Sequence, residues 1–95
     1  MRRFDDLKAI TMAYAYENQV AKLVEEMVEL TEELMKPKPD RERCLDELAD
    51  VRVLVNQMAI YLGLTDAEVK HRMDEKIDRQ LNRIAKINKG SDIDA

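Results

Sequence analysis

The sequence predicts an all-α protein, a small antiparallel bundle of about four helices. Glycine and proline are scarce, at 2 residues each, which disfavours a β-rich or loop-rich chain. Charged residues make up 38% and apolar residues 45% of the 95 residues, a balance that suits amphipathic helices. Apolar residues recur at helical spacing, and short links between helices favour antiparallel neighbours.

The first two helices are predicted over residues 4–16 and 17–35. Asp5 and Asp6 suit the N-terminal turn of the first, and the sequence leaves open whether it runs straight into the second. The second helix carries one apolar stripe, made of Val20, Leu23, Val24, Met27, Leu30 and Leu34. It must end before Pro37 and Pro39, which cannot lie in a helix interior.

The third helix is predicted over residues 41–62 and the fourth from the capping box Thr65–Glu68 to about Gly90. The third is apolar around most of its circumference and should be buried on several sides. One small bundle cannot cover such a helix, so a homodimer is expected. Gly63 is expected to end it as a C-cap. Residues 1–90 are therefore predicted to form one domain, with 91–95 as a frayed tail.

Composition narrows the classes of function. The formal net charge of −4 argues against general nucleic-acid binding. Cys44 is the single cysteine, so no internal disulfide can form and a reducing compartment is expected. No signal peptide and no bilayer-spanning apolar run is seen. We therefore expect a cytoplasmic protein without a membrane partner.

Two acidic clusters lie inside the helical pattern: Glu25, Glu26 and Glu29 on the second helix, and Glu47 and Asp50 on the third. A charge run of this kind is usually a solvated face. Glu47, however, falls in the middle of an apolar face, and a buried glutamate needs an arginine, a hydrogen-bond network or a metal ion. Carboxylates from adjacent helical turns favour Mg²⁺, with Mn²⁺ as an alternative ion.

Two further strips accompany the acids. Gln19, Lys22, Glu26, Glu29 and Glu33 share a polar strip of the second helix. The fourth helix carries a basic strip of Arg72, Lys76, Arg79 and Arg83. The basic strip is either an ordinary solvated flank or a cradle for phosphate groups, which arginine and lysine recognise well.

The segments Lys22–Leu30 and Glu47–Val51 resemble the MazG-like all-α nucleoside triphosphate pyrophosphohydrolases. That family carries a Glu-Glu-x-x-Glu segment on one helix and a Glu-x-x-Asp segment on the next. The similarity covers roughly residues 14–84, and the last helix resembles that of short phage- or prophage-type members. Neither half-motif is specific alone, whereas the two at this spacing are moderately so.

The resemblance implies Mg²⁺-dependent hydrolysis of a nucleoside triphosphate to the monophosphate and pyrophosphate. It implies that Glu26, Glu29, Glu47 and Asp50 hold the metal and that Glu25, Glu26 and Glu29 serve the chemistry, Glu25 through the water. Gln19, Lys22, Lys76 and Arg79 would bind the substrate, and the chain would assemble as a homodimer or homotetramer. Many longer members have a tryptophan near the base, and this chain has none. Tyr14, Tyr16 or Tyr61 would have to stack on the base instead.

Other functions fit less well. A phosphoribosyl-ATP pyrophosphohydrolase shares the acidic motifs, but its second motif is typically followed by a Tyr-His pair, which is missing after Asp50. A non-catalytic helical interaction module would be expected to lose one or more of the acids, and this chain keeps them all. A di-iron protein is disfavoured because Glu-x-x-His pairs are missing.

Overall fold

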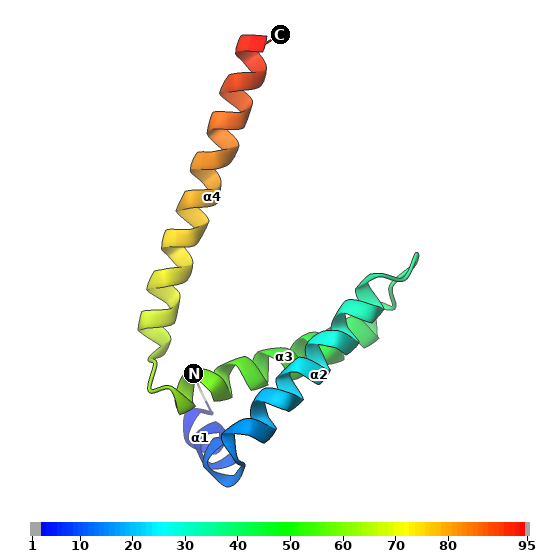
Figure 1. Cartoon of the computed structure of the whole chain (residues 1–95), viewed down its shortest axis with the longest axis vertical. Coiled ribbons are helices and arrows are strands. Elements are labelled where there is room, and N and C mark those ends of the chain that lie inside the picture. Colours follow the sequence, from blue (N-terminus) through cyan, green and yellow to red (C-terminus); the bar gives the residue numbers. More distant parts are fainter. Residues whose placement is uncertain (1–2, 95) are drawn as a thin grey trace. The chain divides into compact units, whose positions relative to one another are not determined.

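A computed structural model describes residues 3–94 of the chain, with side chains as far as Lys89. Every regular element within these residues is helical, which confirms the all-α class (Figure 1). The helices are α1 (Phe4–Ala13), α2 (Tyr16–Leu34), α3 (Arg41–Tyr61) and α4 (Asp66–Asp94). The chain divides into two compact units, Met1–Leu64 and Thr65–Ala95. A single domain over residues 1–90, with all four helices in one bundle, stays a prediction.

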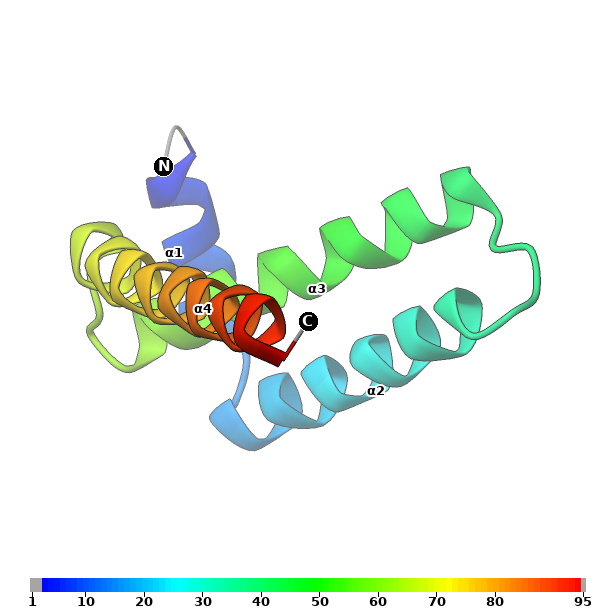
Figure 2. The same ribbon diagram turned by 90° about the horizontal axis from the view of Figure 1, so that it is seen from above.

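The first unit is built on the pair α2 and α3. These helices run antiparallel side by side, and α1 packs against α3 near the open end of the pair (Figures 1 and 2). In the described part of the chain, no helix has the length and apolar character needed to cross a bilayer.

The first helix is shorter than the sequence predicts. It ends at Ala13 rather than at residue 16, because Tyr14 and Ala15 adopt extended backbone conformations and α2 begins at Tyr16. The amide of Gln19 fixes this break: its Nε2 donates to the carbonyl oxygens of Thr11 at 3.0 Å and Tyr14 at 2.9 Å. These bonds satisfy carbonyls that the end of a helix leaves without partners.

We expect Gln19→Leu to lower the free energy of unfolding. Gln19 is 3% exposed, and each buried polar group that loses its partner costs about 1–3 kcal/mol. Thermal or urea unfolding followed by circular dichroism measures the loss. Gln80→Leu on α4, where the glutamine is exposed, is the control. Equal stability of both variants would contradict this role for Gln19.

Hydrogen bonds to Asp40 and Glu33 hold the link between α2 and α3 in place. Asp40 caps α3, its Oδ1 accepting from the backbone N–H groups of Glu42 at 3.0 Å and Arg43 at 3.2 Å. Glu33, only 6% exposed, accepts from Lys36 Nζ at 2.6 Å and from the N–H of Asp40 at 3.0 Å. The hydrogen bond from Lys36, followed by that from Asp40, lowers the pKa of Glu33. Glu33 therefore closes the hairpin of α2 and α3.

The predicted signals around the α3–α4 link are confirmed. Gly63 has φ 72°, and the N–H groups of Gly63 and Leu64 donate to the carbonyls of Ile60 and Ala59, the pattern of a Schellman motif. Thr65 and Glu68 form the capping box, each accepting the other's backbone N–H. The end predicted near Gly90 is wrong, since α4 continues to Asp94. A glycine inside a helix costs about 1 kcal/mol relative to alanine without itself ending the helix. The last residue of the predicted tail, Ala95, lies outside the described residues.

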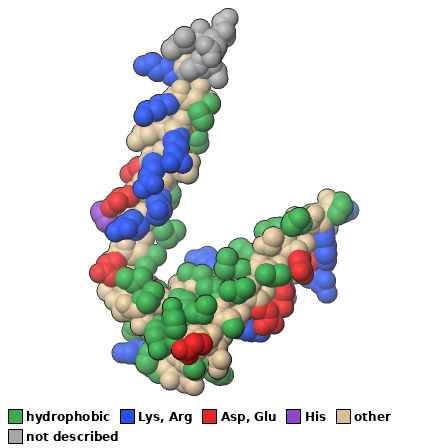
Figure 3. All heavy atoms as spheres, in the orientation of Figure 1, with side chains coloured by type: hydrophobic (Ala, Val, Ile, Leu, Met, Phe, Trp, Pro, Cys, Tyr) green, Lys and Arg blue, Asp and Glu red, His purple; other side chains and the backbone are tan. Residues whose placement is uncertain are grey.

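The apolar stripe predicted for α2 is buried only in part. The buried residues of this helix are all polar, namely Gln19, Glu26 and Glu33. Of the stripe, Val20, Leu23 and Leu30 are half-buried, whereas Val24 and Met27 are 56% and 49% exposed. On α3 only Leu54 and Gln57 are buried, so the expected burial on several sides is not reached within the chain. Figure 3 shows hydrophobic side chains spread over this surface of the first unit. The most buried side of α2 therefore combines Gln19, Glu26 and Glu33 with the half-buried Leu23 and Leu30.

Candidate metal centre

A polar seam runs between α2 and α3, defined here by Gln19, Glu26 and Glu33 on α2 with Glu47, Asp50 and Gln57 on α3. The α2 residues are each seven positions apart, as are Asp50 and Gln57. Seven residues make about two helical turns, so the members of each set lie on one face. Because the helices are antiparallel, Gln57 meets Gln19 at one end, with Nε2 to Oε1 at 3.1 Å, and Glu47 and Asp50 meet Glu26 in the middle.

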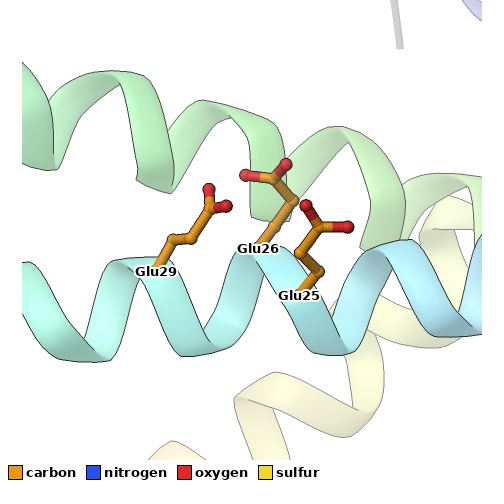
Figure 4. Close-up of side chains that lie close together, drawn as sticks. All are labelled: Glu25, Glu26 and Glu29. Atoms are coloured by element: carbon orange, nitrogen blue, oxygen red, sulfur yellow. The ribbon is translucent and has the colours of Figure 1, made fainter.

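Five carboxylates converge at the middle of the seam and form the carboxylate cluster: Glu25, Glu26, Glu29, Glu47 and Asp50. One group contains Glu25, Glu26 and Glu29, and a second contains Glu26, Glu47 and Asp50; within each, one oxygen per residue lies within 4.8 Å of the others. Figure 4 shows the three α2 carboxylates projecting from the helix on its α3 side. Glu26 belongs to both groups and joins them.

The described side chains neutralise the charge of the cluster only in part. Oε2 of Glu26 and Oε2 of Glu47 are buried without a hydrogen-bond partner. Burial, followed by the contact with Glu26, raises the pKa of Glu47 to about 6. The negative charge of Glu26, followed by burial, raises the pKa of Glu29. Buried carboxylate oxygens without partners are costly, so this arrangement favours a bound cation.

Ion pairs with the described lysines and arginines do not supply partners for these two buried oxygens. Among the described side chains, Lys22 is the one cation in the cluster, 3.1 Å from Glu26 and 3.6 Å from Glu25. The hydrogen bond with Lys22 is the main cause that lowers the pKa of Glu26. No described lysine or arginine forms an ion pair with Glu29, Glu47 or Asp50. An arginine partner for Glu47 is therefore not found in the described part of the chain.

The interpretation of the acids as a solvated face holds for only some of them. The side chain of Glu25 is 57% exposed, and Glu32 and Asp50 are exposed as well. Glu26 and Glu33 are each 6% exposed. The sequence did not single out Glu33 as buried, since its partners come from the link that follows the helix.

A hollow of about 640 Å³ opens beside the cluster. Its acidic end is lined by Lys22, Glu26 and Asp50. Its other end is lined by Ile10, Tyr14, Asn18, Gln19, Leu54 and Gln57. A pocket of this size with both charged and apolar walls is typical of small-molecule sites. Sequence reasoning missed Asn18 and Gln57; the seven-residue spacing from Asp50 to Gln57 is the signal that could have found Gln57.

The predicted substrate-binding residues differ in their position relative to the hollow. Lys22 lies at the acidic end of the hollow, where it could meet a phosphate group. Gln19 also lines the hollow, but its amide is already bonded to Thr11, Tyr14 and Gln57. Lys76 and Arg79 lie on α4 in the second unit, and their meeting with the cluster stays a prediction.

The donor set suits a hard divalent cation. Every candidate ligand atom is a carboxylate oxygen, the ligand type that Mg²⁺ and Mn²⁺ take. Two of these oxygens lack any hydrogen-bond partner, as expected of groups prepared for a ligand. Glu26, Glu47 and Asp50 form one set that could hold such an ion, and Glu25, Glu26 and Glu29 form another. That Glu29 joins Glu47 and Asp50 around a single ion stays a prediction.

Comparison of the chain with protein-family models, with curated proteins and with solved structures finds no match. The features that point to a function are therefore the two acidic motifs, their convergence in the fold and the chemistry of the hollow beside them.

Proposed function

We propose that this chain is a Mg²⁺-dependent nucleoside triphosphate pyrophosphohydrolase that releases the monophosphate and pyrophosphate. One observation carries the proposal: Glu26 and Asp50 of the carboxylate cluster line a hollow whose other walls are apolar, aromatic and amide groups together with Lys22. Within the same cluster, Oε2 of Glu26 and Oε2 of Glu47 are buried without partners. Such a site offers a place for metal-bound phosphates at one end and for a nucleoside at the other. The resemblance of the two acidic segments to MazG-like enzymes points to the same reaction.

The chain's own residues would act mainly by position and charge. Glu26, Glu29, Glu47 and Asp50 would hold the ion, which when bound offsets phosphate charge and makes a water more acidic. Glu25, exposed beside Glu26 and Glu29, would orient the attacking water toward the α-phosphorus. Lys22 would exchange part of its contact with Glu26 for a phosphate oxygen. Phosphoryl transfer depends largely on such positioning and electrostatics.

The direct test is a panel of ribo- and deoxyribonucleoside triphosphates incubated with the protein and Mg²⁺ or Mn²⁺, assayed for pyrophosphate. We expect the monophosphate and pyrophosphate in equal amounts, with no orthophosphate as the first product. Chelation of the metal should stop the reaction. Absence of turnover on every substrate, or release of orthophosphate alone, would contradict the proposal.

The basic strip of α4 gives a second test. Lys76 and Arg79 have no ion pair among the described residues, whereas Arg72 lies 3.9 Å from Glu75. If the strip contacts the triphosphate, Lys76→Ala should raise KM or lower kcat at least about tenfold, because a charge-assisted contact contributes about 1.5–3 kcal/mol. Arg72→Ala is the matched control and should change less. Arg79→Ala should behave as Lys76→Ala does, and equal, negligible effects of all three variants would identify the strip as a solvated flank.

We also propose a homodimer or homotetramer. The described residues include only two buried hydrophobic side chains, Leu7 and Leu54. Large apolar side chains on α2 and α3 are about half exposed, including Met27, Leu48 and Val55. A chain this short has a small core even when well packed, so a second copy is the simplest source of further burial.

The same apolar surfaces support a second candidate, a non-catalytic helical interaction module. Such a module needs neither the metal nor turnover. It would bind a partner protein through the exposed faces of α2 and α3 and remain inactive on the whole substrate panel.

A further inference from the structure

The end of the hollow away from the carboxylates contains a fixed chain of amides. Gln19 Nε2 donates to two backbone carbonyls, those of Thr11 and Tyr14. Carbonyl oxygens only accept, so the Gln19 amide cannot be turned over without losing both bonds. Its Oε1 must therefore face Gln57, and it accepts from Gln57 Nε2 at 3.1 Å.

This arrangement also fixes the amide of Gln57. Turning it over would place its Oε1 against Oε1 of Gln19, two acceptors with no proton between them. Gln57 is 5% exposed and lines the hollow. After its bond to Gln19, Gln57 keeps one N–H and its Oε1, and no described residue pairs with either. A buried amide of this kind holds a donor and an acceptor in a set order.

An aromatic ring lies beside it. Tyr14 lines the same end of the hollow and is 60% exposed. The rings of Tyr16 and Tyr61 contact each other, with centroids 4.7 Å apart, so Tyr14 is the tyrosine among the described residues whose ring face is not taken by another ring. The seven residues from Asp50 to Gln57 span about 10 Å along α3, a separation that a ribose can bridge between phosphates and base.

We propose that Gln57 reads the edge of the nucleobase through its remaining donor and acceptor while Tyr14 stacks on the ring; the inference rests on the proposed function. Adenine and cytosine place an amino donor beside a ring-nitrogen acceptor. Guanine, uracil and thymine place a carbonyl acceptor beside an N–H donor, the opposite order. Because the Gln57 amide is fixed, the site fits one of these two classes and leaves unpaired groups against the other, which is a strong basis for selection.

The probes are the four ribonucleoside monophosphates, titrated into the full chain without metal and followed calorimetrically. We expect one base class to bind about tenfold tighter or more, as paired hydrogen bonds to one base edge allow. Gln57→Met, of similar length and without donor or acceptor, should remove most of this ratio. Tyr14→Leu should weaken all four about 5- to 100-fold while keeping the ratio. Asn56→Leu, a neighbour on α3 outside the hollow, should behave as the native chain.

A second measurement needs no variant. In the native chain, the side-chain amide protons of Gln57 should shift in NMR spectra on addition of the favoured monophosphate and not the disfavoured one. An unchanged base ranking in Gln57→Met, or Gln57 amide signals that ignore every monophosphate, would overturn the inference. Base-selective binding without triphosphate hydrolysis would remove the proposed function and keep the base site. Hydrolysis of triphosphates without base selection would support the proposed function and overturn the base site.

Discussion

Glu47→Gln should abolish triphosphate turnover and weaken Mg²⁺ binding more than about 100-fold, beyond the 10- to 100-fold typical of supporting residues around a metal. Glu47 meets Glu26 and Asp50 at the centre of the cluster, and its buried Oε2 has no hydrogen-bond partner. The amide keeps the shape but supplies no charge. Calorimetric titration with Mg²⁺ and the pyrophosphate assay measure the two losses. Glu42→Gln, an exposed position at the start of the same helix, is the control.

The raised pKa of Glu47 predicts that the free energy of unfolding depends on pH differently in the native chain and in Glu47→Gln. Burial holds the pKa of Glu47 at about 6, above the 4.5 of an unperturbed glutamate, so the folded chain binds this proton more tightly than the unfolded chain. The stability from Glu47 is therefore fully present below pH 4.5 and is lost as pH rises through about 6. Glu26 and Glu33, whose pKa values are lowered, act in the opposite direction. The difference between the native chain and Glu47→Gln isolates Glu47.

Without metal, the gap in stability between Glu47→Gln and the native chain should move in favour of the variant between pH 4.5 and pH 7. Urea unfolding with chelator at several pH values measures this gap. A variant that fails to fold, or a gap that does not change with pH, would mean that Glu47 serves the fold rather than a cation.

Met27→Glu should break the assembly. Met27 lies on the outer face of α2 and is 49% exposed within one chain. If a second copy covers this face, the new carboxylate is buried without a partner, which costs about 3–5 kcal/mol and weakens association more than about 100-fold. Sedimentation velocity should show a dimer or tetramer for the native chain and a monomer for the variant. Lys38→Glu, in the α2–α3 link, is the control, and a native chain that stays monomeric at high micromolar concentration would refute the prediction.

The features predictable from sequence are those set by neighbours along the chain. The capping box at Thr65 and the left-handed Gly63 depend on residues three or four positions away, and both were found where expected. The end of α1 was not predictable in this way. It depends on Gln19 reaching back eight residues to Thr11, a contact that no propensity encodes.

The side of α2 that meets α3 was predictable only in part. An apolar stripe normally marks the buried side of a helix, and Gln19, Glu26 and Glu33 lie beside the stripe of α2 rather than in it. The rule assumes that a helix is buried by its own chain. The convergence of Glu26 with Glu47 was foreseen because Glu47 lies among apolar residues. The burial of Glu33 was not, since it depends on the backbone N–H of Asp40.

The hydrogen bonds at the two ends of the α2–α3 hairpin affect the order of folding and of the proposed cation binding. Gln19 with Gln57 holds one end and Glu33 with Asp40 holds the other, while the charges of Glu26, Glu29 and Glu47 repel one another in the middle, where burial and this repulsion raise the pKa of Glu47. The hydrogen bonds at the two ends therefore hold together two helices whose carboxylates repel each other between these ends. If the proposed cation binds, it would meet ligands that folding has already brought together, so much of the entropy of collecting them would be lost during folding rather than on binding. Folding alone would thus position the carboxylates, and binding of a cation would reduce their repulsion without a change of conformation.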